Sequence, residues 1–138
     1  MTDYARLLNQ LTTDTLDAAT FRHVDHLGVA YQALANSGFF DALHTVATGI
    51  DRAATRAGAL DKFNATITVA FMCLIAERMV ANPYDNAQDF IDRNPDLVTG
   101  APLRALYSPE RMTSARARRI ALLPDLPQDG SRQRLTIG

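Results

Sequence analysis

The sequence predicts an all-α fold: a compact single domain, built as a helical bundle of about five to seven helices. The chain has 138 residues, of which 47% are hydrophobic and 21% are charged, a balance typical of one globular domain. Its apolar residues recur every three or four positions over long segments, and turn-forming residues separate those segments. We therefore expect one hydrophobic core enclosed by helices.

Three helices are predicted in the first part of the chain, each from apolar residues at helical spacing. The first covers 3–11. The second covers 21–36 and stops at Ser37-Gly38, a pair typical of helix ends. The third covers 39–57 and contains Gly49, which we expect to weaken it only modestly.

A fourth, central helix is predicted over 66–80, where apolar and small residues are dense and Asn82-Pro83 follows. Its first residues, Thr66-Ile67-Thr68-Val69, also have strand propensity, but the length of the segment favours a helix. Together with the second and third helices it should form the core. That core should be aliphatic, because the chain has no tryptophan, and Cys73 should be a small core residue.

Shorter helices are predicted after residue 83. One contains Ala87 and Phe90 and closes at Asn94-Pro95, and a single helical turn follows over 102–107. Ser108 and Ser114 then offer two further helix starts.

The chain divides into a helical domain over 1–123 and a C-terminal segment over 124–138. The second segment has prolines and little apolar periodicity, so we expect a tail or a docking arm.

Charge and composition exclude several classes of partner. Fourteen Lys and Arg against fifteen Asp and Glu give a net charge of -1, which provides no basic footprint for nucleic acid. The longest apolar stretch, Ile67 to Ala76, is too short to cross a membrane core of about 30 Å. The first residues lack the pattern of a signal peptide, and the single cysteine cannot form an internal disulfide, so we expect a soluble, cytoplasmic protein.

Two histidines, His23 and His26, form the most informative motif. A spacing of three places them on adjacent turns of one helix face, which also carries Leu27 and Ala30. We therefore expect the pair to point toward the core or toward a cleft in it. Three interpretations stay open: hydrogen-bonded structural groups, half of a transition-metal site, or an acid/base or binding element of a metal-free site.

A metal site would need a third ligand, for which Glu77 is the first candidate and His44 the second. Glu77 is a carboxylate on a mostly apolar helix, so it should either pair with a cation, Arg22 or Arg78, or serve a site. The sequence favours no metal and names no cofactor.

Further polar residues are candidates for binding a substrate. Asn64 and Thr68 stand at the predicted start of the fourth helix, where they would orient a ligand. The alternative is that Asn64 or Thr66 simply caps the helix. Tyr31, on the helix that bears the histidines, is a third candidate.

The chain resembles a group of small, largely uncharacterised bacterial helical proteins. The resemblance rests on Phe21-Arg22-His23-Val24-Asp25-His26-Leu27, an F-x-H-x-x-H-L motif, and on Lys62-Phe63-Asn64-Ala65-Thr66-Ile67-Thr68. In the group the second motif is usually K-Y-H-x-T-x-T. A histidine at position 64 would complete a set of three with His23 and His26, whereas asparagine is a poor ligand for a transition metal.

The leading functional hypothesis is a small cytoplasmic enzyme or biosynthetic tailoring protein that binds a small organic substrate in a helical pocket. His23, His26 and Glu77 would be its catalytic groups, and Asn64, Thr68 and Tyr31 would contact the substrate. The alternatives are a divalent-metal protein using the first three residues, or a non-catalytic binding protein that forms a homodimer. An exposed apolar patch around Phe39-Phe40 or Tyr107 would favour the dimer. We expect no nucleic-acid or membrane partner.

Overall fold

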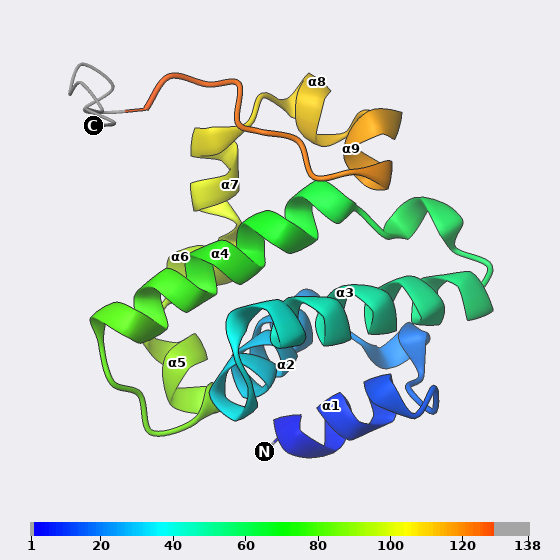
Figure 1. Ribbon diagram of the computed structural model, residues 1–138, viewed down its shortest axis with the longest axis vertical. Coiled ribbons are helices and arrows are strands. Elements are labelled where there is room, and N and C mark those ends of the chain that lie inside the picture. Colours follow the sequence, from blue (N-terminus) through cyan, green and yellow to red (C-terminus); the bar gives the residue numbers. More distant parts are fainter. Residues whose placement is uncertain (1, 129–138) are drawn as a thin grey trace.

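The structure, a computed structural model, describes residues 2–128, with the backbone alone at Leu60. Within that range all regular structure is helical, as predicted, and no strand is formed (Figure 1). The elements in chain order are α1 (Tyr4–Thr12), η1 (Ala18–Thr20), α2 (His23–Asn36), α3 (Phe39–Arg56), η2 (Leu60–Lys62), α4 (Ala65–Ala81), α5 (Ala87–Arg93), α6 (Pro95–Thr99), α7 (Ala101–Leu106), α8 (Pro109–Met112) and α9 (Ala115–Arg119), where η marks a single 3₁₀ turn.

The four long helices lie within two residues of their predicted bounds. The segment that begins at Thr66 is helical despite its strand propensity, because Asn64 caps its first turn and the segment is long enough for four turns. The sequence missed α6, which starts with Pro95 at its first position, and both 3₁₀ turns. These elements are too short to show apolar periodicity.

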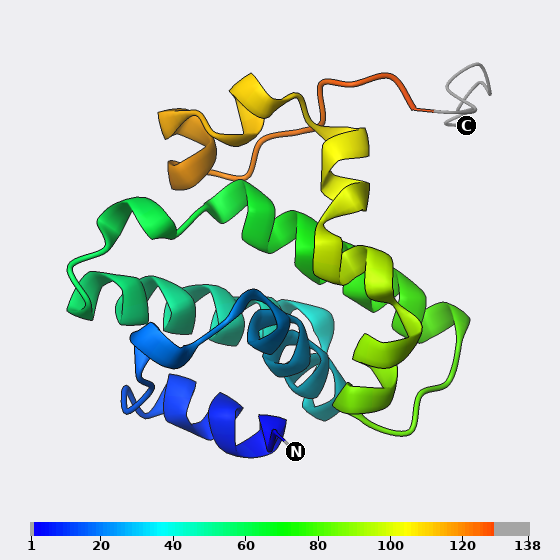
Figure 2. The ribbon, with the colours of Figure 1, turned by 180° about the vertical axis from the view of Figure 1, so that it is seen from behind.

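Helix α2 is the centre of the bundle and contacts α1, α3, α4, α5 and α6. Helices α3 and α4 run side by side, and α1 lies on the other side of α3 (Figures 1 and 2). Helices α7 and α9 cover the face of α4 turned away from α3. The three predicted core helices are therefore in contact with one another, with α2 surrounded most completely.

The core is more aromatic than expected. Phe90 of α5 is fully buried, and its ring centroid lies 5.2 Å from that of Tyr31 and 4.8 Å from that of Tyr84. Cys73, expected in the core, is exposed on α4. Apolar spacing alone did not separate the inner from the outer side of α4, because this helix is apolar on nearly all sides.

Two glycines allow α1 to approach the other helices closely. A Cβ atom at Gly28 of α2 would overlap the Tyr4 ring, and one at Gly49 of α3 would overlap the Leu11 side chain. The propensity cost of Gly49 is thus accompanied by a packing role that the sequence did not reveal.

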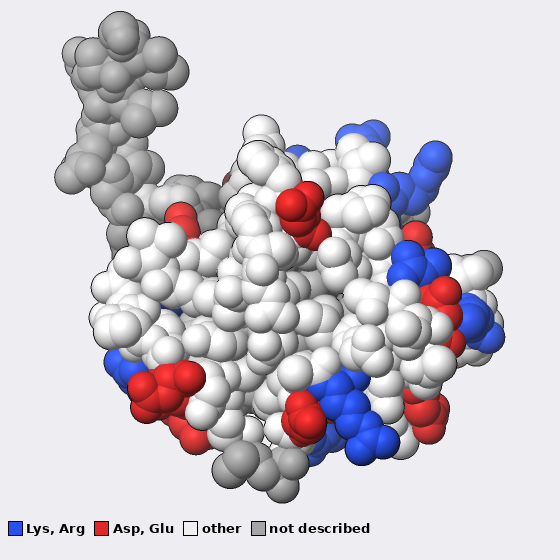
Figure 3. All heavy atoms as spheres, turned by 60° about the horizontal axis from the view of Figure 1, so that its bottom comes forward, with Lys and Arg blue, Asp and Glu red and all other residues white. Residues whose placement is uncertain are grey.

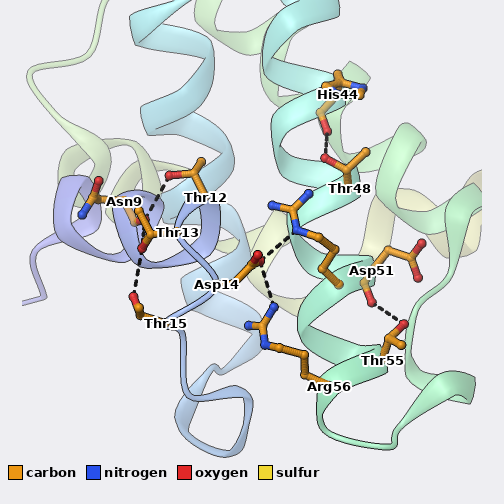
Figure 4. Close-up of polar contacts among 11 residues, drawn as sticks. Asn9, Thr12, Thr13, Asp14, Thr15, His44, Thr48, Asp51, Thr55 and Arg56 are labelled. Atoms are coloured by element: carbon orange, nitrogen blue, oxygen red, sulfur yellow. Dashed lines mark hydrogen bonds and ion pairs between the residues drawn. The ribbon is translucent and has the colours of Figure 1, made fainter.

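A brace fastens the segment between α1 and η1 to α3. Asp14 adopts φ 59°, a left-handed conformation that aspartate tolerates. Its Oδ1 accepts hydrogen bonds from Arg52 Nε at 2.8 Å and from Arg56 Nη1 at 2.9 Å (Figure 4). The brace fixes the chain just before it reaches η1.

The C-terminal segment is docked as far as it is described. Leu126 N donates to Leu106 O at 3.1 Å, and Asp125 accepts hydrogen bonds from both the backbone and the hydroxyl of Ser108. Residues 124–128 thus lie against α7 and the start of α8. The rest of the predicted tail, 129–138, falls outside the described residues.

The surface carries charges of both signs. On the face shown in Figure 3, acidic and basic side chains lie next to one another at several places near the edge. None of the helices in the described part of the chain is long and apolar enough to cross a membrane.

Candidate functional site

Two hollows adjoin the first turn of α2. The inner one, about 70 Å³, lies between α2, α3 and α4, and the outer one, about 320 Å³, lies between α3, η1 and η2. His26 and Ile50 line both, so these two side chains separate one hollow from the other. The outer hollow is in the size range of small-molecule sites, whereas the inner one is below it.

The wall of the outer hollow is mostly made of methyl groups. Apart from His26 and Lys62, its lining is apolar. Small side chains leave space where larger ones would fill it, so the abundance of alanine explains the hollow. The alanines are Ala18, Ala19, Ala53, Ala54, Ala57 and Ala59.

The imidazole of His26 is partly buried between the two hollows. Its ring centroid lies 4.4 Å from that of Phe21. Burial, and next the neighbouring His23, lower the pKa of His26 from 6.5 to about 4, although Asp25 acts in the opposite direction. At neutral pH the ring is uncharged, with one N–H donor and one nitrogen acceptor.

His23 lies at the edge of the inner hollow and is exposed. Its Nε2 is 3.4 Å from Leu97 O, and its ring centroid is 5.2 Å from that of Phe71. The centroids of His23 and His26 are 6.4 Å apart, too far for a hydrogen bond between the two rings. The predicted pair is thus placed on one cavity wall, but its members occupy different environments.

Asp25, which lies between the two histidines in the sequence, is buried and fixes the start of α2. Its Oδ2 accepts a hydrogen bond from Arg22 N at 2.9 Å, and its Oδ1 pairs with Arg22 Nη2 at 3.2 Å. This is the carboxylate half of a capping box. The sequence signal for this capping box was an acidic residue at the third position of the helix. The hydrogen bonds of Asp25 also fix the turn that holds both histidines.

Thr68 lines the inner hollow with the histidines, but Asn64 does not. Asn64 Oδ1 accepts from Ile67 N at 2.9 Å, and its Nδ2 donates to Met112 O at 2.8 Å. The asparagine therefore caps α4 and fastens α8 to it. Both ends of its amide are occupied by the protein, as the capping interpretation of the sequence expected.

Glu77 and Tyr31 are not brought to the histidines. Glu77 is exposed on α4 and lines neither hollow. Tyr31 faces α5, with its hydroxyl 3.5 Å from Tyr84 O. Within residues 2–128, no group of three or more His, Cys, Asp or Glu side chains is gathered closely enough to hold a metal ion.

The cations suggested as partners of Glu77 pair with other carboxylates. Arg22 binds Asp25, and Arg78 binds Asp96 through two hydrogen bonds of 2.7 Å. Both of these aspartates lie in the first turn of a helix. The spacing of apolar residues does not predict such ion pairs.

Lys62, at the end of η2, is the one cation of the described residues that lines the outer hollow. In the sequence it appeared only as the first residue of the motif Lys62-Phe63-Asn64-Ala65-Thr66-Ile67-Thr68. Its placement depends on the turn of η2, which the sequence did not predict.

Comparisons with known protein families, with curated proteins and with solved structures give no match to this chain. The function is therefore argued from the geometry of the site.

Proposed function

We propose that the protein binds a small, largely apolar organic molecule in the outer hollow, with His26 as a neutral hydrogen-bonding group at its inner end. The observation that supports this most directly is a hollow of about 320 Å³ whose lining is apolar except for His26 and Lys62. Apolar walls with a few polar groups are typical of small-molecule sites.

The low pKa of His26 favours a binding role over proton transfer. A general base is most effective when its pKa lies near the working pH, whereas His26, with a pKa of about 4, is a weak base at neutral pH. An uncharged imidazole still donates and accepts hydrogen bonds. His23, the more accessible ring, lines only the inner hollow, so it lies outside the proposed binding site.

The walls of the hollow are held in place by polar contacts outside it. The Asp14 brace to α3 (Figure 4) fixes the chain that leads into η1, and Asp25 fixes the start of α2. A site that is formed before the ligand arrives requires less ordering on binding.

The dimer hypothesis receives less support. Phe40 is 81% exposed and packs edge-on against Phe39, but Tyr107 is buried and its hydroxyl donates to Leu122 O at 2.8 Å. A single exposed phenylalanine is much smaller than the apolar patches typical of interfaces.

The binding proposal can be tested with 1-octanol, a neutral amphiphile, added to protein labelled with ¹³C at its alanine methyl groups. We expect saturable shifts in the NMR signals of Ala53, Ala54 and Ala57, which line the hollow. Ala35 and Ala81, which line neither hollow, should not shift. Shifts that are absent, or that are equal at all five alanines, would contradict a site at this place.

A further inference from the structure

The charged residue that lines the outer hollow is a cation. The lining residues of the hollow include Lys62, a cation, and His26, whose ring is uncharged at neutral pH, and they include no Asp or Glu. Any charged group that enters the hollow therefore meets a cation and no fixed anion of the lining. Such an arrangement favours a ligand with a negative charge over a neutral or cationic one.

Lys62 also differs from the cations that brace the fold. Arg22, Arg52, Arg56, Arg78 and Arg93 each pair with an aspartate. None of the ion pairs among residues 2–128 involves Lys62. A ligand carboxylate could pair with its ammonium without first displacing a protein carboxylate.

The position of Lys62 relative to the apolar wall limits the shape of a ligand. The lysine is the last residue of η2, and the rest of the wall is made of six alanines together with Leu16, Phe21, Ile50 and His26. A charged group at Lys62 is solvent-accessible, because this side chain is exposed, while an attached apolar body is removed from water against the alanine methyl groups.

On the basis of the proposed binding function, we propose that the ligand is a small amphipathic carboxylic acid. Its carboxylate pairs with Lys62, and its apolar body lies against the alanine wall and ends at the barrier formed by His26 and Ile50. The acid is recognised by charge at one end and by apolar burial along the rest.

Octanoate and 1-octanol, which share a chain length and differ in charge, test this proposal by titration calorimetry. In Lys62→Gln we expect the affinity for octanoate to fall about three- to tenfold, because an accessible ion pair is lost, while the affinity for octanol stays within about twofold. Lys62→Arg should retain most of the octanoate affinity. Added salt should weaken the binding of octanoate but not of octanol.

Arg6→Gln is the matched control. It removes the same unit of charge from an exposed position on α1, away from both hollows, and should leave both affinities unchanged. Spectra of the alanine methyl groups check that each variant is folded.

Three outcomes separate the two proposals. The proposal of a carboxylic acid ligand is supported if the affinity falls only for octanoate, and only in Lys62→Gln. If both compounds bind and neither affinity depends on Lys62, the proposal of a carboxylic acid ligand is wrong, and the apolar binding site is retained. The same conclusion follows if Arg6→Gln lowers the affinity for octanoate as much as Lys62→Gln does. If neither compound binds the wild-type protein at the alanine wall, both proposals are overturned.

Discussion

The two halves of α2 are packed differently: one lies in a closely packed cluster, and the other borders open space. Near its C-terminal half, Tyr31 packs against Phe90 and Tyr84 in a filled aromatic cluster. At its first turn, His26 separates two hollows (Figure 2 shows the helix from the side of α1 and α5). The difference follows from side-chain size, because three aromatic rings pack together at one end, whereas six alanines line the outer hollow at the other.

Close packing and open space contribute differently to a small domain. A filled cluster adds dispersion contacts and buried apolar area, which stabilise the fold. An open apolar hollow contributes neither, so the fold gains no stability from it. A molecule bound at the alanine wall, as proposed, would supply the contacts that the open hollow lacks.

The largest loss of stability should come from removing a ring of the aromatic cluster. Phe90→Ala should lower the free energy of unfolding by about 3–5 kcal/mol, because a fully buried ring is lost and a cavity is left. Ile50→Ala, at the hollow end, should cost less than about 2 kcal/mol, because Ile50 is partly exposed and already borders open space. Urea denaturation of both variants measures the two costs.

Equal costs for the two substitutions would show that the hollow end is packed as tightly as the aromatic end. The comparison between the two ends, and with it the reason for a ligand, would then fail. The slope of unfolding against urea should stay constant in both variants, which shows that the loss lies in the folded state.

A smaller decrease in the free energy of unfolding is expected when the pH is lowered. The folded protein holds the pKa of His26 at about 4, below the 6.5 of an unperturbed histidine. Between these values the unfolded chain binds a proton that the folded chain does not, so stability should fall as the pH falls from about 6.5 to 4. The loss should be at most about 3 kcal/mol, because solvent reaches part of the ring.

His26→Asn should flatten this part of the stability profile while leaving the further loss at lower pH. That loss belongs to aspartates such as Asp14 and Asp96, whose pKa values are lowered mainly by hydrogen bonds from Arg52 and Arg78, respectively. A profile as steep in His26→Asn as in the wild type between pH 6.5 and 4 would rule out burial of a neutral His26.

The fold was largely predictable because the four long helices carry strong local signals. Apolar spacing located each of them, and Ser37-Gly38 and Asn82-Pro83 marked two of their ends correctly. Short elements were harder. Helix α6 has five residues, fewer than two turns, so no apolar face repeats in it.

The candidate site was predictable only in part. The spacing of His23 and His26 placed both on one wall, and Thr68 joined them. Glu77 did not, because α4 is apolar on nearly all sides and its sequence does not show which side faces α2. Lys62 and the alanine wall were missed because alanine gives no functional signal, and a hollow arises only when several elements meet.

The smallest change in stability should come from filling the outer hollow. Ala57 caps α3 and borders the hollow while remaining accessible to solvent. In Ala57→Leu we expect the free energy of unfolding to stay within about 0.5 kcal/mol of the wild type, because the added methyl groups enter open space.

Binding of octanol to Ala57→Leu should nevertheless weaken at least about threefold, since the added side chain occupies ligand volume. Ala35→Leu, at an exposed position of α2 that borders neither hollow, is the matched control and should leave binding unchanged. Unchanged octanol affinity in Ala57→Leu would mean that the ligand does not occupy the alanine-lined end. A loss of binding without a loss of stability would instead show that this end of α2 is kept open for a ligand rather than for the fold.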